Sequence, residues 1–281
     1  MHNLFLYLLI VILIITPSFA NAQVHGGKHQ KLFDLFAFEK YEDCAFKALS
    51  MSENDKYRRD PEIYLYLSMT HYEISKMDPE DLDEEYKAPI QDALKYAAKY
   101  AKKDKEKEFW DGNKNFFDNL KTAGIKEAQN WDEQGKARKA ASTFGRIVKY
   151  DPDPNVRFAK GFCDIKAQNS QGALEIKAGL KEITKNYKDP NYKPDNVSEP
   201  VLIETLVNYT KYLEEQQLLD SAKIVITLAR DLMNENEKIE AKYNKVYNIE
   251  TKEEKKPEEK NGMKIIYEQH SSEESSNQET E

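Results

Sequence analysis

Residues 122–154 read TAGIKEAQNWDEQGKARKAASTFGRIVKYDPDP, and this stretch decides the fold of the chain. Small and aromatic residues and a final proline follow at successive steps of 12, 4, 3 and 5 residues, at Ala128, Ala140, Phe144, Ile147 and Pro152. Small side chains let two helices approach closely, aromatic side chains fill the space beside them, and proline ends a helix. Gln134-Gly135 separates the two helical segments. The stretch therefore predicts a helix–turn–helix unit.

This unit resembles the tetratricopeptide repeat (TPR), a helix–turn–helix motif of about 34 residues. Similar spacing recurs from Ala93 to Tyr100 and from Ala222 to Ala229, in part within 161–180, and more loosely within 44–51. The resemblance implies an all-α fold over residues 31–250: a right-handed α-solenoid of antiparallel helix pairs with about four irregular units. It assigns repeat packing to Ala128, Trp131, Ala140, Phe144, Ile147, Pro152, Ala222, Ile226 and Ala229.

Residues 1–22 have the composition of a secretory signal peptide. They contain no Lys, Arg, Asp or Glu, and Leu4–Ile15 is an unbroken apolar run. This run is shorter than the ~20 residues of a spanning helix, and Ala20-Asn21-Ala22 fits a cleavage site. We therefore expect cleavage after Ala22 and a soluble periplasmic or secreted protein. Because Met1-His2-Asn3 carries no Lys or Arg, an uncleaved anchor over Leu4–Ala20 is the alternative.

Polar and proline-containing stretches predict where the helices begin and end. Residues 23–30 form a polar linker, and a helical hairpin follows over 31–51. Asp60-Pro61 marks a helix start, because proline suits the first helical position. The remaining predictions are an acidic loop at 77–85, a long helix over 86–110, a loop at 186–200, a terminal helix over 236–247 and a disordered acidic tail at 251–281.

Charge and cysteine content limit the kinds of ligand and of covalent crosslink that we expect. The net charge is −8, and no cluster of Lys and Arg with aromatic residues predicts a nucleic-acid groove. The segment 251–281 holds nine Glu and five Lys, so half of the net charge lies there. Cys44 and Cys163 lie in apolar helical segments, where we expect buried free thiols rather than a disulfide.

The sequence carries no recognised catalytic motif. Because hydrolase motifs, phosphate-binding loops and CxxC pairs are all missing, we expect no catalytic residue, no metal and no cofactor. Among the five His, only His71 lies in the predicted helical domain. One metal-binding alternative lies at the expected mature terminus, where a free amine and His25 of Gln23-Val24-His25 suit Cu(II) or Ni(II), with His29 nearby.

Proteins of the TPR family bind partners mainly through the first helix of each unit, along a concave face. The resemblance therefore implies a protein-binding scaffold. With the expected export, we expect this scaffold in a periplasmic or envelope assembly such as a secretion or surface-motility system. The matching positions are Leu65, Met69, Tyr72, Ile125, Gln129, Phe158, Phe162 and Lys211. Because most of them are apolar or aromatic, we expect an extended or helical apolar segment as the partner. Each position can instead complete the core between repeats.

Two other functions stay open, a periplasmic ligand-binding protein and an enzyme without a known motif that acts on envelope polymers. A carbohydrate pocket would favour clustered Trp residues, and only Trp110 and Trp131 are present. The scaffold is therefore the favoured interpretation.

Overall fold

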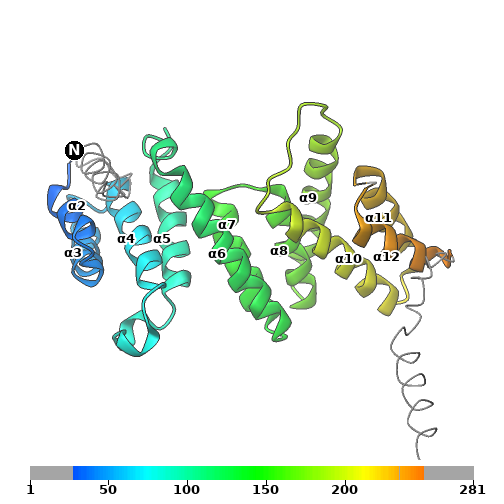
Figure 1. Ribbon diagram of the computed structural model, residues 1–281, viewed down its shortest axis with the longest axis horizontal. Coiled ribbons are helices and arrows are strands. Elements are labelled where there is room, and N and C mark those ends of the chain that lie inside the picture. The colour runs from blue at the N-terminus through cyan, green and yellow to red at the C-terminus, as the bar shows by residue number, and fades with distance from the viewer. Residues whose placement is uncertain (1–27, 234, 250–281) are drawn as a thin grey trace, which may run out of the picture.

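The computed structural model describes residues 28–233 and 235–249 of the 281-residue chain. These residues form eleven α-helices and no β-strand, which confirms the predicted all-α class. Figure 1 shows that the helices follow one another along the longest axis of the molecule. In chain order they are α2 (Gln30–Ala37), α3 (Tyr41–Glu53), α4 (Pro61–Ile74), α5 (Pro89–Lys103), α6 (Lys114–Glu133), α7 (Ala137–Tyr150), α8 (Pro154–Lys166), α9 (Gln171–Tyr187), α10 (Glu199–Glu215), α11 (Leu219–Leu232) and α12 (Glu237–Tyr247). The predicted signal peptide, 1–22, and acidic tail, 251–281, lie outside the described residues.

Ten of the helices form five consecutive pairs, from α2–α3 to α10–α11, against the predicted number of about four. Four pairs share one turn, in which Glu39, Gly135, Gln168 or Gln217 adopts a left-handed φ between 58° and 72°. The backbone N–H of the next residue donates to a carbonyl oxygen of the preceding helix at 2.8–2.9 Å, as in a Schellman motif. Because such short connections reverse the chain, the helices of these four pairs are antiparallel.

Polar side chains cap several helices where the sequence indicates a start. The side chain of Asp60 accepts a hydrogen bond from the backbone N–H of Glu62, and Pro61 occupies the first position of α4. Asp153 does the same for α8, and Asn236 caps α12. The predicted start at Asp60-Pro61 and the predicted terminal helix are therefore confirmed.

The predicted long helix over 86–110 is wrong, because α5 ends at Lys103. Beyond this end, the Asp104 carboxylate accepts hydrogen bonds from the Tyr100 hydroxyl and from the backbone N–H of Glu108. These bonds stabilise a turn around a single carboxylate. The run KKDKEKE alone does not distinguish such a turn from an exposed helical face.

The described structure begins inside the predicted linker, 23–30. Lys28 and His29 form a turn directly before α2. His29 is only 7% exposed, and its ring meets the edge of Tyr57 with the centroids 5.8 Å apart. The expectation that His71 is the only histidine in the folded domain is therefore wrong.

Helix α8 contributes to two hydrophobic cores. Val156 and Ala159 face the first core, which extends over α2 to α7 and takes Val201 from α10. Phe158 and Phe162 face the second core, which α9 to α12 complete. The two halves of the molecule are thus built on different faces of one helix.

Glycine brings α8 and α9 close together. A methyl group added at Gly161 would lie 2.8 Å from the backbone nitrogen of Ile176. One added at Gly172 would lie 2.7 Å from the carbonyl oxygen of Gly161 and 2.7 Å from the backbone nitrogen of Ile165. Glycine weakens an isolated helix by up to ~1 kcal/mol relative to alanine, but here it permits a backbone contact that a larger residue prevents.

We expect Gly172→Ala to destabilise the protein by about 1–3 kcal/mol, because the added methyl group meets two backbone atoms. Urea unfolding followed by circular dichroism measures this change. Gly145→Ala is the control, since its methyl group would meet only the flexible end of Lys160, at 3.4 Å. The control is expected to be neutral or slightly stabilising. Equal losses in the two variants would contradict the role of Gly172 in close packing.

Candidate functional site

Three neighbouring cavities form one groove along α6. The largest, about 660 Å³, lies between the α4–α5 connection and α6. A second of about 590 Å³ lies between the end of α4 and α6, and a third of about 80 Å³ is lined by α6, α7, α8 and α10. The first two share Glu127, and the last two share Gln129 and Glu133. We call this surface the α6 groove, and its main lining residues are Tyr72, Ile90, Glu127, Gln129, Glu133 and Glu204.

Aromatic rings in the groove are already covered in part by lysines of the chain. The Lys76 ammonium lies 4.2 Å from the ring centroid of Tyr72. Trp131 is flanked by Lys136 and Lys139, whose ammonium groups lie 4.7 Å and 4.5 Å from its ring centroid. These cation–π contacts orient the rings and leave Ile90 as a half-buried aliphatic surface in the groove.

The groove also carries uncompensated negative charge. Among the ion pairs of the described residues, none involves Glu127, Glu133 or Glu204. The Gln129 amide donates to Glu204 Oε2 at 2.8 Å and so joins α6 to α10. Lys76, Lys87 and Lys126 also line the groove. Lys76 pairs with Glu73 and Lys87 with Glu84, so only Lys126 among these lysines has no ion pair within the described residues. The charge balance of this surface therefore favours a positively charged ligand.

Five of the eight residues expected to contact a partner lie in the hydrophobic cores. Their exposure is at most 6%, and they are Leu65, Met69, Ile125, Phe158 and Phe162. Packing between helices, the alternative function of these positions, accounts for their apolar side chains. Helical spacing identifies the face on which they lie but does not show which neighbouring helix covers that face.

The other three expected contact residues are accessible, and two of them line the α6 groove. These are Tyr72 and Gln129, both half-buried. Lys211 is exposed and pairs with Glu215 at 3.7 Å, away from the lining residues. The sequence did not identify four lining residues of the groove, Ile90, Glu127, Glu133 and Glu204. An unpaired carboxylate has no signature in a sequence where 33% of residues are charged.

The residues assigned to repeat packing are mostly buried. The exposed fraction is 0% for Ala128, Ala140, Ile147, Ala222, Ile226 and Ala229. Phe144 is 2% exposed and also borders the smallest cavity of the groove. Trp131 is half-buried in the groove, and Pro152 is exposed in the α7–α8 connection.

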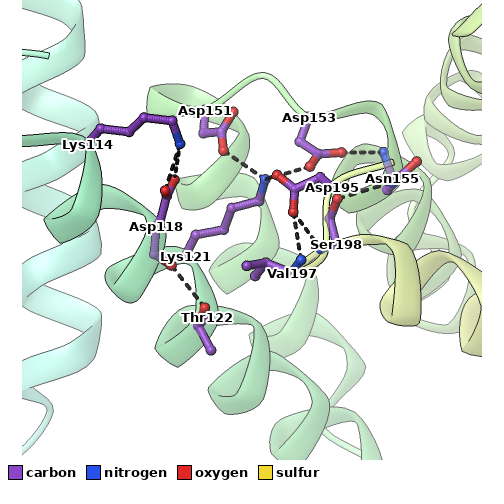
Figure 2. A network of polar contacts seen from close by, with 10 residues as sticks. All are labelled: Lys114, Asp118, Lys121, Thr122, Asp151, Asp153, Asn155, Asp195, Val197 and Ser198. Carbon is purple, nitrogen blue, oxygen red and sulfur yellow. Dashed lines mark hydrogen bonds and ion pairs between the residues drawn. The ribbon is translucent and has the colours of Figure 1, made fainter. Parts of the chain in front are cut away.

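A buried lysine connects α6 with two other segments. The ammonium nitrogen of Lys121 lies 2.6 Å from Asp153, 2.9 Å from Asp151 and 3.1 Å from Asp195 (Figure 2). Asp151 and Asp153 belong to the α7–α8 connection, whereas Asp195 lies in the long loop 188–198 before α10. We call these four residues the Lys121 junction.

Further hydrogen bonds shape the loop at this junction. Asp195 Oδ1 accepts from the backbone N–H groups of Val197 at 2.8 Å and Ser198 at 3.0 Å. The amide of Asn155, at the start of α8, donates to the Ser198 hydroxyl at 3.1 Å (Figure 2). The proline-containing loop predicted at 186–200 is therefore held at a defined position where α10 begins.

Opposite charges keep Lys121 protonated although its side chain is only 3% exposed. Burial opposes the charge, but the Asp153 and Asp151 carboxylates outweigh it and raise the pKa of Lys121. Burial raises the pKa of Asp151, whereas the Ser198 N–H and Lys121 outweigh burial at Asp195 and lower its pKa. The contribution of Lys121 to the free energy of unfolding is therefore fully present below the ordinary pKa of lysine. The contribution of Asp195 is lost at low pH, as the pH falls through the lowered pKa of this carboxyl group.

We expect Lys121→Met to destabilise the protein by about 3–5 kcal/mol at neutral pH, because it leaves clustered carboxylates without their cation. Chemical denaturation measures the loss. Lys114→Met on the same helix is the control, since Lys114 forms an exposed ion pair with Asp118. Such a pair contributes at most about 0.5 kcal/mol. Similar losses in both variants would show that the Lys121 junction contributes no more than a surface pair.

The two buried thiols and the buried imidazole of His71 lack the properties of catalytic groups. Cys44 and Cys163 are free and buried, as predicted. Burial raises the pKa of each thiol to about 12, with a further contribution from Asp132 at Cys163. Burial also lowers the pKa of His71, whose Nδ1 lies 2.7 Å from the Leu67 carbonyl oxygen. At neutral pH these groups are therefore uncharged packing residues.

We expect both cysteines to be inert toward a thiol-reactive dye in the native protein, because neither is accessible as a thiolate. Labelling of two thiols per chain is expected after unfolding in urea. Mass spectrometry of the two samples measures this difference. Rapid native labelling of either cysteine would contradict its burial.

No protein-family model, curated protein or solved structure matches this chain. Within 28–233 and 235–249, no helix is both long enough and apolar enough to cross a membrane.

Proposed function

We propose that this chain is a TPR-like, right-handed α-solenoid that recruits a protein partner into the α6 groove. The turn shared by four helix pairs and the succession of helices along one axis support the repeat architecture (Figure 1). The groove follows α6 and takes residues from α4 and α10, and each of these is the first helix of its pair. The second helices α5 and α7 add Ile90 and Phe144. First helices are the partner-binding elements that the family resemblance implies.

The uncompensated carboxylates of the groove are the observation that carries this proposal. Glu127 and Glu133 lie beside the apolar surfaces of Tyr72 and Ile90, and Glu204 lines the adjoining cavity, which also includes Glu133. A segment that places an apolar side chain against these surfaces and Lys or Arg beside the carboxylates satisfies both features. The partner is thus an extended or helical segment with apolar and basic residues, rather than a wholly apolar one.

We propose that the protein is exported, which would place this interaction outside the cytoplasm. The composition of residues 1–22 supports a secretory signal, with cleavage after Ala22. We therefore propose a periplasmic or envelope assembly as the setting. The chain acts there as a non-enzymatic scaffold.

Site-specific photo-crosslinking in the native host tests the groove. We expect a crosslinker that replaces Lys126 to capture a discrete partner, because this exposed position lines the groove. The same crosslinker at Ile224, which is 69% exposed on α11, is expected to capture none. Equal capture at both positions, or none at Lys126, would refute the assignment.

A charge-reversal pair tests the chemistry of recognition. We expect Glu133→Lys with Glu204→Lys to reduce capture by about tenfold or more, because like charges at an interface cost several kcal/mol. Glu53→Lys with Glu237→Lys changes the net charge equally at exposed positions outside the groove. That control is expected to retain capture. Circular dichroism of both variants verifies that they are folded.

A further inference from the structure

A histidine and two carboxylates meet at the N-terminus of α4. His29 Nε2 lies 3.0 Å from Asp60 Oδ2. One ring nitrogen of His29 and one carboxylate oxygen each of Asp60 and Glu62 lie within 4.8 Å of one another. The ammonium of Lys28 also contacts Asp60 Oδ2, at 2.6 Å. The other carboxylate oxygen of Asp60 caps α4. One carboxylate oxygen of Asp60 thus caps a helix, and the other contacts a cation.

Glu62 is the exception among the buried carboxylates of the described residues. Glu62 is only 3% exposed, and its Oε1 atom has no hydrogen-bond partner among the described residues. By contrast, Asp104 accepts three hydrogen bonds, Asp153 pairs with Lys121, and Asp164 pairs with Lys160. A buried carboxylate oxygen without a partner is costly, so its position beside His29 requires an explanation.

We propose that His29, Asp60 and Glu62 bind a divalent transition-metal ion, with Zn²⁺ as the best match. An imidazole nitrogen with two carboxylate oxygens suits Zn²⁺, whereas Ca²⁺ and Mg²⁺ prefer oxygen ligands alone. The two carboxylates balance the charge of the ion. Ligand atoms around a tetrahedral Zn²⁺ lie ~3.4 Å apart, so atoms now within 4.8 Å need only small side-chain rotations.

Lys28 shows how an ion reaches this site. Its side chain is 68% exposed, whereas those of His29 and Asp60 are 4% and 8% exposed. The lysine therefore extends from solvent to the carboxylate and can return to solvent when a metal ion replaces its ammonium. A water molecule completes the coordination on the side that Lys28 leaves.

This site differs from the alternative at the expected mature terminus. The terminal motif needs the free amine and His25 of Gln23-Val24-His25, and it favours Cu(II) or Ni(II) in a square-planar arrangement. The site at α4 needs neither of them. The bound ion would connect the chain before α2 to the first turn of α4.

Isothermal titration of the intact protein with Zn²⁺ tests the proposal. One ion per chain is expected, with affinity reduced by about tenfold or more in His29→Gln and Glu62→Gln. Glu84→Gln, which alters a carboxylate that is 93% exposed, and His25→Ala are expected to retain the affinity of the unchanged protein. Unchanged affinity in Glu62→Gln, or loss of binding in His25→Ala, would overturn the assignment.

Lys28→Met provides a test that does not depend on altering a buried residue. This variant removes the competing ammonium, so we expect tighter Zn²⁺ binding and a larger Zn²⁺-dependent rise in Tm than in the unchanged protein. Weaker or equal binding would show that the cluster is only an ion pair that caps α4. Circular dichroism without metal checks the fold of each variant.

Discussion

One buried ammonium group fixes the middle of this molecule. Lys121 contacts carboxylates from the α7–α8 connection and from the loop before α10, two segments far apart in the sequence. A lysine without such partners would not remain charged at this depth. Because the loop is held there, α10 packs on α8 as well as on α11, and its Val201 enters the first core. The wall of the α6 groove that α10 supplies therefore depends on the Lys121 junction.

The two hydrophobic cores determine which side chains remain accessible to a partner. Helix α8 gives apolar side chains to both cores, and its glycine contact with α9 leaves no room for an added methyl group at Gly161 or Gly172. Apolar residues of the first helices, such as Ile125 and Phe158, are likewise used between helices. In the α6 groove, Tyr72 and Ile90 remain as half-buried apolar surfaces beside carboxylates that form no ion pair within the described residues. Specificity in the α6 groove consequently rests more on charge than on apolar area.

The sequence predicts helix boundaries well where local chemistry decides them. Asp60-Pro61, Gln134-Gly135 and the start of α12 were located because caps, proline and glycine act within a few residues. The end of α5 was missed because Asp104 organises a turn with residues that also suit a helix. The α6 groove and the Lys121 junction combine residues from distant segments. No spacing rule indicates which charges meet when helices that are not adjacent in sequence pack together.

Helix α4 connects the two proposed sites. Its first turn holds Glu62, and its last turn leads to Tyr72 in the α6 groove. Its 14 residues span about 21 Å, and every residue from Glu62 to His71 is buried. A helix packed on all sides cannot slide without opening cavities in the core. A metal ion bound at His29, Asp60 and Glu62 would therefore fix α4 at one end, and the groove wall at its other end would keep the same position.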